Sequence, residues 1–106
     1  MPTKEISPAD AAALVERGAL LVDIREAAER EAGVIPSAAH APLSRFAETE
    51  LVAQSGQPVI FHCRSGGRTA LNADVLTAKA GARETYLLKG GIEAWQAAGL
   101  PFALPS

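Results

Sequence analysis

Short apolar runs alternate along this chain with longer segments in which apolar positions follow helical spacing. The apolar runs at residues 20–24, 59–62 and 85–88 predict buried strands. A strand without regular polar interruptions is typical of a parallel sheet that is covered on both faces. The pattern therefore predicts parallel strands at the centre of the molecule.

The segments between these strands carry the signals of helices. Residues 9–17 follow a capping Ser7 and a Pro8 suited to a first turn, and they end at Gly18. The other segments are residues 26–31, 43–54, 69–80 and 91–98, which have helical character, and residues 38–42, which read as extended with a short strand. This alternation predicts an α/β domain with a mostly parallel central sheet of about five strands and helices on both faces.

Length and charge narrow the class of protein. A chain of 106 residues fits one domain, which we expect to span residues 1–106 with a core at about 6–102. A net charge of −2 gives no general attraction to nucleic acid or to an acidic membrane surface. No apolar stretch approaches the ~20 residues needed to span a bilayer, and the N-terminus lacks the pattern of a signal peptide. We therefore expect a cytoplasmic protein with neither a nucleic-acid nor a membrane partner.

The cysteine content restricts the chemistry. The chain has one cysteine, so it forms no internal disulfide and has no second thiol to resolve an oxidised one. A structural zinc site needs several Cys or His ligands close together, and the sequence does not supply them. We expect no metal and no bound cofactor.

This cysteine begins a loop rich in glycine and arginine, Cys63-Arg64-Ser65-Gly66-Gly67-Arg68, directly after a predicted strand. The next predicted helix would direct its positive N-terminal end and its free N–H groups at the thiol, which favours the thiolate. Gly66 and Gly67 allow positive φ angles that let N–H groups curl around an anion. Arg64 and Arg68 add positive charge that does not titrate. We interpret Cys63 as a catalytic nucleophile and residues 64–68 as an anion-binding loop.

Other polar side chains follow the remaining predicted strands. Ligands of an open α/β sheet bind outside the carboxyl ends of its strands. Asp23 and Arg25 follow one strand, Lys89 follows another, and His40 and His62 lie near the same edge. We expect Asp23, Arg25, His62 and Lys89 to surround the nucleophile in a second layer. In this layer, Asp23 and Arg25 would form a polar network that holds the loops together.

The loop at residues 63–68 resembles the active-site loop of the rhodanese (thiosulfate sulfurtransferase) family. Three more segments resemble family motifs in the family's order: an aspartate-x-arginine stretch at 21–26, a glycine-histidine-isoleucine-proline-glycine-alanine passage at 33–38, and a glycine-glycine-tryptophan segment at 88–101. The resemblance spans residues 6–102. Val34 and Ser37 depart from the family's frequent histidine and glycine.

The resemblance implies a single rhodanese-like domain and a sulfurtransferase that works in two steps through a persulfide on Cys63. The thiolate would take a sulfur atom from a donor such as thiosulfate, and an acceptor would then remove that atom. The implied acceptors are cyanide, a cellular thiol or a redoxin-type protein, and the covalent persulfide replaces any cofactor. In this scheme Arg64 draws in the anionic donor, and Arg68 tethers the loop by pairing with an acid such as Asp23.

Two other functions remain open. A rhodanese-like domain can act as a sulfur-relay or partner-binding module with little free turnover. The loop is also similar to that of cysteine phosphatases, which combine a thiolate, N–H groups and an arginine to bind phosphate. Phosphatase loops place five residues between cysteine and arginine, whereas four residues, 64–67, intervene here. The shorter ring favours a single sulfur atom over a phosphate.

Overall fold

The computed structural model describes residues 3–104, and five parallel strands form its central sheet. The strands are β1 (Lys4–Ile6), β2 (Leu20–Asp23), β3 (Ala39–His40), β4 (Val59–His62) and β5 (Thr85–Leu88). Their order across the sheet is β1-β5-β4-β2-β3, and each neighbouring pair is parallel. The predicted α/β architecture with a parallel sheet of about five strands is confirmed.

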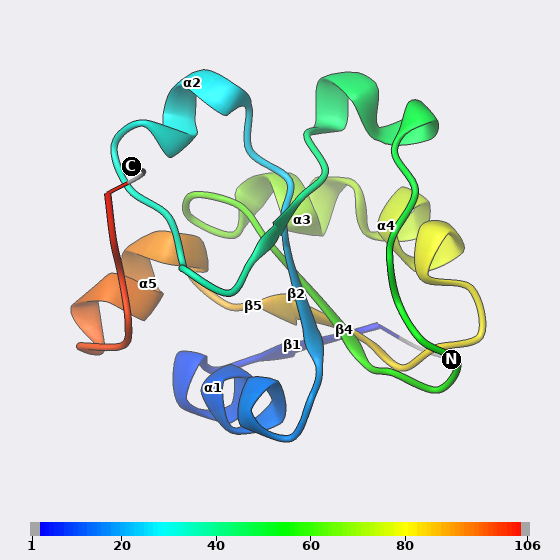
Figure 1. Cartoon of the computed structure of the whole chain (residues 1–106), viewed down its shortest axis with the longest axis horizontal. Helices are drawn as coiled ribbons and strands as arrows, with labels where there is room; N and C mark the ends of the chain where they lie inside the picture. The colour runs from blue at the N-terminus through cyan, green and yellow to red at the C-terminus, as the bar shows by residue number, and fades with distance from the viewer. Residues whose placement is uncertain (1–2, 105–106) are drawn as a thin grey trace.

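Helices connect the strands and cover both faces of the sheet (Figure 1). They are α1 (Pro8–Glu16), α2 (Ala27–Arg30), the 3₁₀ helix η1 (Leu43–Glu48), α3 (Gly67–Leu71), α4 (Ala73–Ala80) and α5 (Gly91–Ala97). One core cluster packs Leu21 and Ile60 of the sheet with Trp95 of α5, and the other packs Phe61 with Leu76 of α4. Within residues 3–104, no helix has the length and apolar character needed to cross a membrane.

The apolar pattern does not predict β1. Two of its three residues, Lys4 and Glu5, are polar and exposed. The strand forms because it pairs in parallel with β5, with Ile6 opposite Leu88. Charged residues suit a strand at the edge of a sheet because they discourage pairing with another chain. Pairing with β5, and not local hydrophobicity, therefore decides this element.

The helix predicted at residues 43–54 is much shorter in the structure. Arg45 within η1 has non-helical angles (φ −129°, ψ 23°), and Thr49 is already extended. Two side chains from a distant segment bind carbonyl groups of the passage that follows. Lys79 Nζ donates to the carbonyl oxygen of Thr49 (2.5 Å), and Arg83 donates to two further carbonyls (3.0 Å each). These tertiary bonds take the place of the helical bonds that the periodicity predicts.

The helix predicted at residues 69–80 begins earlier, at Gly67, and is broken into α3 and α4. The break lies at Asn72, which has a φ of −110° and a ψ of 18°. The Asn72 Nδ2 donates to the carbonyl oxygen of Arg68 at 2.7 Å. A short polar side chain that binds the backbone in this way competes with regular helical geometry.

The topology places the carboxyl end of β4 at the point where the direction of the chain across the sheet reverses. The chain passes from β2 to β3 on one side of the sheet and from β4 to β5 on the other, so its direction across the sheet reverses between β2 and β4. The register puts Asp23 beside His62 at the carboxyl ends of these two strands, and Cys63 follows directly. Ligand sites in open parallel sheets lie outside such a reversal point. The fold therefore places Cys63 where a ligand site is expected.

The C-terminal segment returns to the passage before β3. Val34 and Ala103 form an antiparallel bridge, with N–H···O distances of 2.7 and 2.9 Å. Next to it, a Cβ atom on Gly33 would lie 1.9 Å from the ring of Phe102, so a larger residue here would displace the ring. Backbone pairing among the described residues thus includes Lys4 in β1 and Ala103 near the C-terminus.

Candidate active site

Cys63 directly follows β4, and a short loop leads from it to α3. The Cys63 side chain is buried, with 1% of its surface exposed. Gly66 precedes α3 with a φ of 96°, a left-handed conformation that favours glycine. Gly67 begins α3 and is not among the residues with positive φ. The expectation of a positive φ is therefore correct for Gly66 and wrong for Gly67, because a single left-handed residue completes the turn.

Hydrogen-bond donors converge on the sulfur atom. The N–H of Gly66 donates to Cys63 Sγ at an N···S distance of 3.2 Å. Burial raises the pKa of the Cys63 thiol, but the N–H groups of Thr69, Gly66 and Arg68, together with the Thr69 hydroxyl, outweigh burial. The pKa of the thiol is therefore lowered from its ordinary value, in the direction that the loop sequence predicts. The site favours a thiolate.

Thr69 is a site residue that the sequence analysis does not single out. Its side chain is fully buried, and its Oγ1 lies 3.9 Å from Cys63 Sγ. The same hydroxyl donates to the carbonyl oxygen of Gly66 at 3.0 Å. Thr69 therefore fixes the loop turn and faces the sulfur at once. Its place in the first helical turn after a glycine-rich loop is the signal that could have identified it.

Gly91 lies directly behind the loop, at the start of α5. The N–H of Ile92 donates to the carbonyl oxygen of Cys63 (2.9 Å), and the N–H of Glu93 donates to that of Arg64 (3.1 Å). A Cβ atom on Gly91 would lie 2.5 Å from the carbonyl carbon and oxygen of Arg64. The close backbone contact that supports the loop therefore requires glycine at this position.

The two loop arginines have different surroundings. Arg68 forms a bidentate ion pair with Glu29 of α2, and both N···O distances are 2.7 Å. The Arg68 hydrogen bonds lower the pKa of Glu29 to about 2, and Glu29 raises the pKa of Arg68. Arg68 thus pairs with an acid as expected, but the expected partner, Asp23, is wrong. Asp23 already binds Arg25, and α2 brings Glu29 to the loop instead.

Arg64 lies at the surface. Its side chain is 70% exposed, and its Nε donates to Glu93 Oε2 (3.1 Å), on a side chain that is 55% exposed. Exposed ion pairs of this kind are weak because water screens them. The neighbouring Ser65 is also exposed. The guanidinium of Arg64 is therefore accessible to an anion from solution, whereas that of Arg68 is held by Glu29.

Asp23 and Arg25 form a buried polar cluster at the carboxyl end of β2. Asp23 is fully buried and accepts hydrogen bonds from Arg25 Nε (3.0 Å) and Nη2 (2.8 Å). Arg25 Nη2 also donates to the carbonyl oxygen of Gly33 (2.8 Å), and Arg30 Nη1 lies 3.6 Å from Asp23. Burial raises the pKa of Asp23, but the hydrogen bonds from Arg25 outweigh it and the pKa is lowered. This cluster connects the β2 end to the loop that follows α2.

His62 lies between this cluster and the nucleophile. It is fully buried, and its Nδ1 lies 3.1 Å from the carbonyl oxygen of Cys63, to which it can donate. Its Nε2 lies 3.8 Å from Asp23 Oδ2 without a hydrogen-bond partner among the described residues. Burial lowers the pKa of His62, which favours the neutral imidazole. His62 therefore contacts the backbone of the nucleophile.

The remaining two candidates, His40 and Lys89, contact the backbone of other segments. His40 Nε2 lies 2.8 Å from the carbonyl oxygen of Arg25, so His40 supports the loop after β2. Lys89 is exposed, and its backbone N–H bonds the carbonyl oxygen of Ile6 in β1 (2.9 Å). The backbone of Lys89 thus continues the pairing between β5 and β1.

The described side chains include no evident metal ligand set. Among residues 3–104, no three His, Cys, Asp or Glu side chains are grouped so that they could hold a metal ion. Near the loop, a ligand could contact the N–H donors around Cys63 and the side chains of an adjacent pocket.

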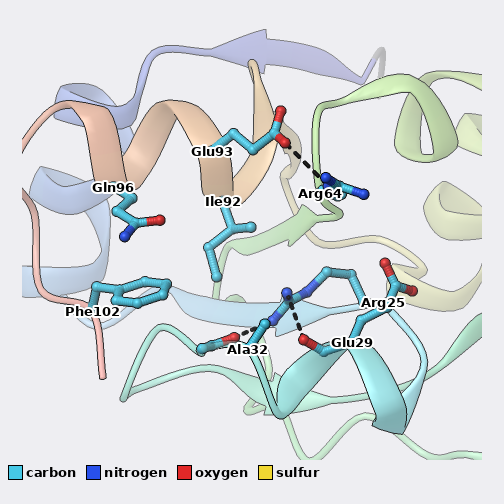
Figure 2. Close-up of a pocket in the computed structure, with 9 residues that line it drawn as sticks. Arg25, Glu29, Ala32, Arg64, Ile92, Glu93, Gln96 and Phe102 are labelled. Carbon is cyan, nitrogen blue, oxygen red and sulfur yellow. Dashed lines mark hydrogen bonds and ion pairs between the residues drawn. The ribbon is translucent and has the colours of Figure 1, made fainter. Parts of the chain in front are cut away.

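This pocket has a volume of about 340 Å³ and borders the loop at Arg64. Arg64 and Glu93 lie on one side of it, Arg25 and Glu29 lie on the other, and Phe102 closes one end (Figure 2). The walls therefore come from the loop, α5, α2 and the C-terminal segment. The sequence analysis does not predict this pocket, because these segments are distant in the chain.

Comparison with known proteins gives a consistent result over most of the chain. The family model described as "Rhodanese-like domain" matches residues 7–98. The thiosulfate sulfurtransferase GlpE of Pseudomonas savastanoi pv. phaseolicola is 33% identical over 94 residues, which cover 89% of this chain and 88% of that protein.

Solved structures share the fold. A rhodanese-related protein from Thermoplasma volcanium has a TM-score of 0.81 at 24% identity, and the match covers 96% of this chain and 99% of that chain. A Rhodopseudomonas palustris protein of unknown function, described as a "possible tyrosine phosphatase", has a TM-score of 0.76 at 29% identity. The match covers 95% of this chain and 85% of that chain.

Proposed function

This chain belongs to the rhodanese-like domain family, and from that premise we propose that it is a sulfurtransferase that carries sulfur on Cys63. The donor is a sulfane-sulfur compound such as thiosulfate, and the acceptor is a thiol, or cyanide in an assay. The observation that carries the proposal is a buried thiol that accepts a backbone hydrogen bond and has a lowered pKa. The name of the similar Pseudomonas protein, thiosulfate sulfurtransferase, supports the same reaction.

In the first step, the Cys63 thiolate attacks the outer sulfur of thiosulfate. The S–S bond of the donor breaks, and sulfite leaves with the electron pair, so that Cys63 carries a persulfide. The N–H groups of Gly66, Arg68 and Thr69 would stabilise the negative charge on the outer sulfur, as oxyanion-hole donors do. The exposed Arg64 would attract the anionic donor. Arg68 would act on the loop through its bond to Glu29.

In the second step, the acceptor attacks the outer sulfur of the persulfide and restores the Cys63 thiolate. The acceptor could be a small thiol or the thiol of a redoxin-type protein. The cycle uses no cofactor and no metal, because the persulfide itself stores the transferred atom. We place the reaction in the cytoplasm, where an unpaired cysteine stays reduced.

A sulfur-relay or partner-binding module is the alternative. Weak turnover of thiosulfate combined with fast sulfur exchange to one protein thiol would favour it. A cysteine phosphatase is a weaker alternative, which the description of the R. palustris structure raises. Its arginine would have to clamp a phosphate, whereas Arg68 here binds Glu29 through both of its terminal nitrogens.

The test is the intact mass of the protein after incubation with thiosulfate and then with cyanide. We expect a gain of one sulfur atom, followed by its loss with the formation of thiocyanate. The Cys63→Ser variant is the control, and it should gain no sulfur. A folded wild-type protein that gains none would contradict the proposal, and phosphatase activity would be measured next.

A further inference from the structure

The pocket beside the loop carries more functional groups than a dianion such as thiosulfate would use. Arg64 and Glu93 have opposite charges, lie at the surface, and approach each other to 3.1 Å (Figure 2). Gln96 adds an amide on the same face of α5, while Ile92 and Phe102 add apolar surface. The volume of about 340 Å³ lies near the lower limit for small-molecule sites, which are about 300–1,000 Å³. The pocket therefore suits a small ligand with several polar groups.

The charges of the pocket are balanced. Of its four charged side chains, Arg25 is bound to Asp23 (2.8 Å) and Glu29 is bound to Arg68 (2.7 Å). Arg64 and Glu93 are the two whose charges are exposed. A dianion would be attracted by Arg64 and repelled by Glu93. A molecule with one positive and one negative group would be attracted by both.

Arg64 and Glu93 can each bind a charged ligand group in place of the other at a small cost in free energy. Both side chains are more than half exposed, and an exposed pair contributes little to stability. A ligand carboxylate could form two parallel bonds with the guanidinium of Arg64. A ligand ammonium group could at the same time bind the carboxylate of Glu93.

We propose that this pocket, the acceptor pocket, binds the sulfur acceptor, and that the acceptor is a small zwitterionic thiol of the amino-acid type. Its carboxylate binds Arg64, its ammonium group binds Glu93, and its thiol attacks the persulfide. The inference rests on the sulfur transfer proposed above. Arg64 lines the pocket and directly follows Cys63, and α5 binds the carbonyl groups of both residues, so the pocket borders the loop that carries the nucleophile.

The transfer step balances without any further reagent. The thiolate of the acceptor attacks the outer sulfur of the Cys63 persulfide and forms a new S–S bond. The bond between Cys63 Sγ and the outer sulfur breaks, and its electron pair stays on Sγ. The products are the free Cys63 thiolate and the persulfide of the acceptor, so no oxidant or reductant is required.

The test measures the second step alone. The protein is loaded with thiosulfate, freed of excess donor and mixed with L-cysteine, cysteamine, 3-mercaptopropionate or 2-mercaptoethanol. Of these thiols, L-cysteine carries both charged groups and 2-mercaptoethanol carries neither. Cysteamine carries only the ammonium group, and 3-mercaptopropionate carries only the carboxylate. We expect cysteine to react about five- to tenfold faster per thiolate than 2-mercaptoethanol, which corresponds to two weak ionic contacts of about two- to threefold each. Equal rates per thiolate for all four would overturn the proposal.

The Glu93→Gln variant makes the test specific. It should slow transfer to cysteine and to cysteamine about two- to threefold and leave 3-mercaptopropionate unaffected or slightly faster. The same variant should react no more slowly with thiosulfate, because it removes a repelling charge. Glu50→Gln, an exposed change outside the pocket, is the matched control and should alter none of these rates. An equal slowing of all acceptors by Glu93→Gln would contradict the proposal.

A binding measurement separates this inference from the sulfur chemistry. S-methyl-L-cysteine carries both charges but no thiol, and its binding is followed by the shifts of backbone NMR signals. We expect shifts at Arg64, Glu93 and Gln96 that weaken in Glu93→Gln. Such binding without persulfide formation would refute the sulfur transfer and still support a zwitterion site. Persulfide formation without such binding would refute the acceptor pocket and leave the sulfur transfer intact.

Discussion

The reactivity of Cys63 depends on a balance between burial and hydrogen bonding. Burial disfavours the charged thiolate, yet the thiol pKa is lowered because the donors of Thr69, Gly66 and Arg68 surround the sulfur. The Thr69 hydroxyl lies 3.9 Å from the sulfur and has one proton, which it can donate either to a thiolate or to the carbonyl oxygen of Gly66 (3.0 Å). A few hydrogen bonds within one loop thus lower the pKa of the nucleophile despite its burial.

The alkylation rate of Cys63 should reveal this balance. We expect the rate with iodoacetamide to fall as the pH falls through a midpoint below the ordinary thiol pKa of about 8.5. Thr69→Val removes the hydroxyl with little change in shape, so the midpoint should rise. Thr69→Ser retains the hydroxyl and should keep the midpoint near that of the wild type. A midpoint that is identical in all three proteins would show that the hydroxyl does not act on the sulfur.

At the scale of secondary-structure elements, two contacts hold the catalytic loop in place. On one side, the ion pair between Arg68 and Glu29 joins α3 to α2. On the other, the first turn of α5 donates hydrogen bonds to the carbonyl groups of Cys63 and Arg64. The loop therefore depends on elements that precede and follow it by many residues.

The ion pair between α2 and α3 should make stability depend on acid pH. The pKa of Glu29 is lowered from 4.5 to about 2, so its stabilising effect is present above pH 4.5 and is lost as the pH falls toward about 2. We expect Glu29→Gln to lower the free energy of unfolding by about 1 kcal/mol near neutral pH, since the pair is partly exposed. The difference from the wild type should shrink between pH 4.5 and 2 in urea titrations. Glu48→Gln, which alters an exposed pair with Arg45, should show no such trend.

The contact between α5 and the loop should be sensitive to a single methyl group. In Gly91→Ala, the Cβ would lie 2.5 Å from backbone atoms of Arg64, which cannot move without shifting the loop. Gly99→Ala is the matched control, because Gly99 also has a positive φ (76°) but has open space around it. We expect Gly91→Ala to lose about 1–3 kcal/mol more stability than Gly99→Ala, as overpacking does. Thermal unfolding measures this difference, and equal losses would show that the contact is not tight.

At the scale of the whole molecule, one sheet supports two separate cores. Leu76 and Phe61 belong to the cluster on one face, and Trp95 and Ile60 belong to the cluster on the other. Neighbouring residues of β4 belong to different clusters, so the same strand supports the packing on both faces. We therefore expect the two layers to unfold together, as small single domains usually do.

This cooperativity can be tested with the single tryptophan. Trp95 reports on one core, and Leu76→Ala damages the other, where Leu76 is fully buried. We expect the variant to lose about 2–5 kcal/mol. Trp95 fluorescence and far-UV circular dichroism should shift to the same new midpoint. Leu71→Ala, at an 87% exposed position, should change stability by less than about 0.5 kcal/mol. Separate midpoints for the two signals would mean that the layers unfold independently.

Local patterns in the chain were sufficient for the central strands and for the nucleophile. Strands β2, β4 and β5 are mostly apolar and mostly buried because both of their faces are covered, so burial is visible in the residues themselves. The loop from Cys63 to Arg68 was identifiable because its cysteine, glycines and arginines are adjacent in sequence. These features express short-range chemistry, and the sequence specifies them directly.

Pairing between distant segments was decided only by the tertiary structure. The sequence does not predict that Arg68 binds Glu29 in preference to Asp23, because both residues carry the same charge. Likewise, β1 forms because it pairs with the free edge of β5. The 3₁₀ helix η1 ends early because Lys79 and Arg83 bind the backbone carbonyl groups that follow it. Such choices depend on which groups the completed sheet brings within a few ångströms. Their physical origin is competition among chemically equivalent partners, which only three-dimensional proximity resolves.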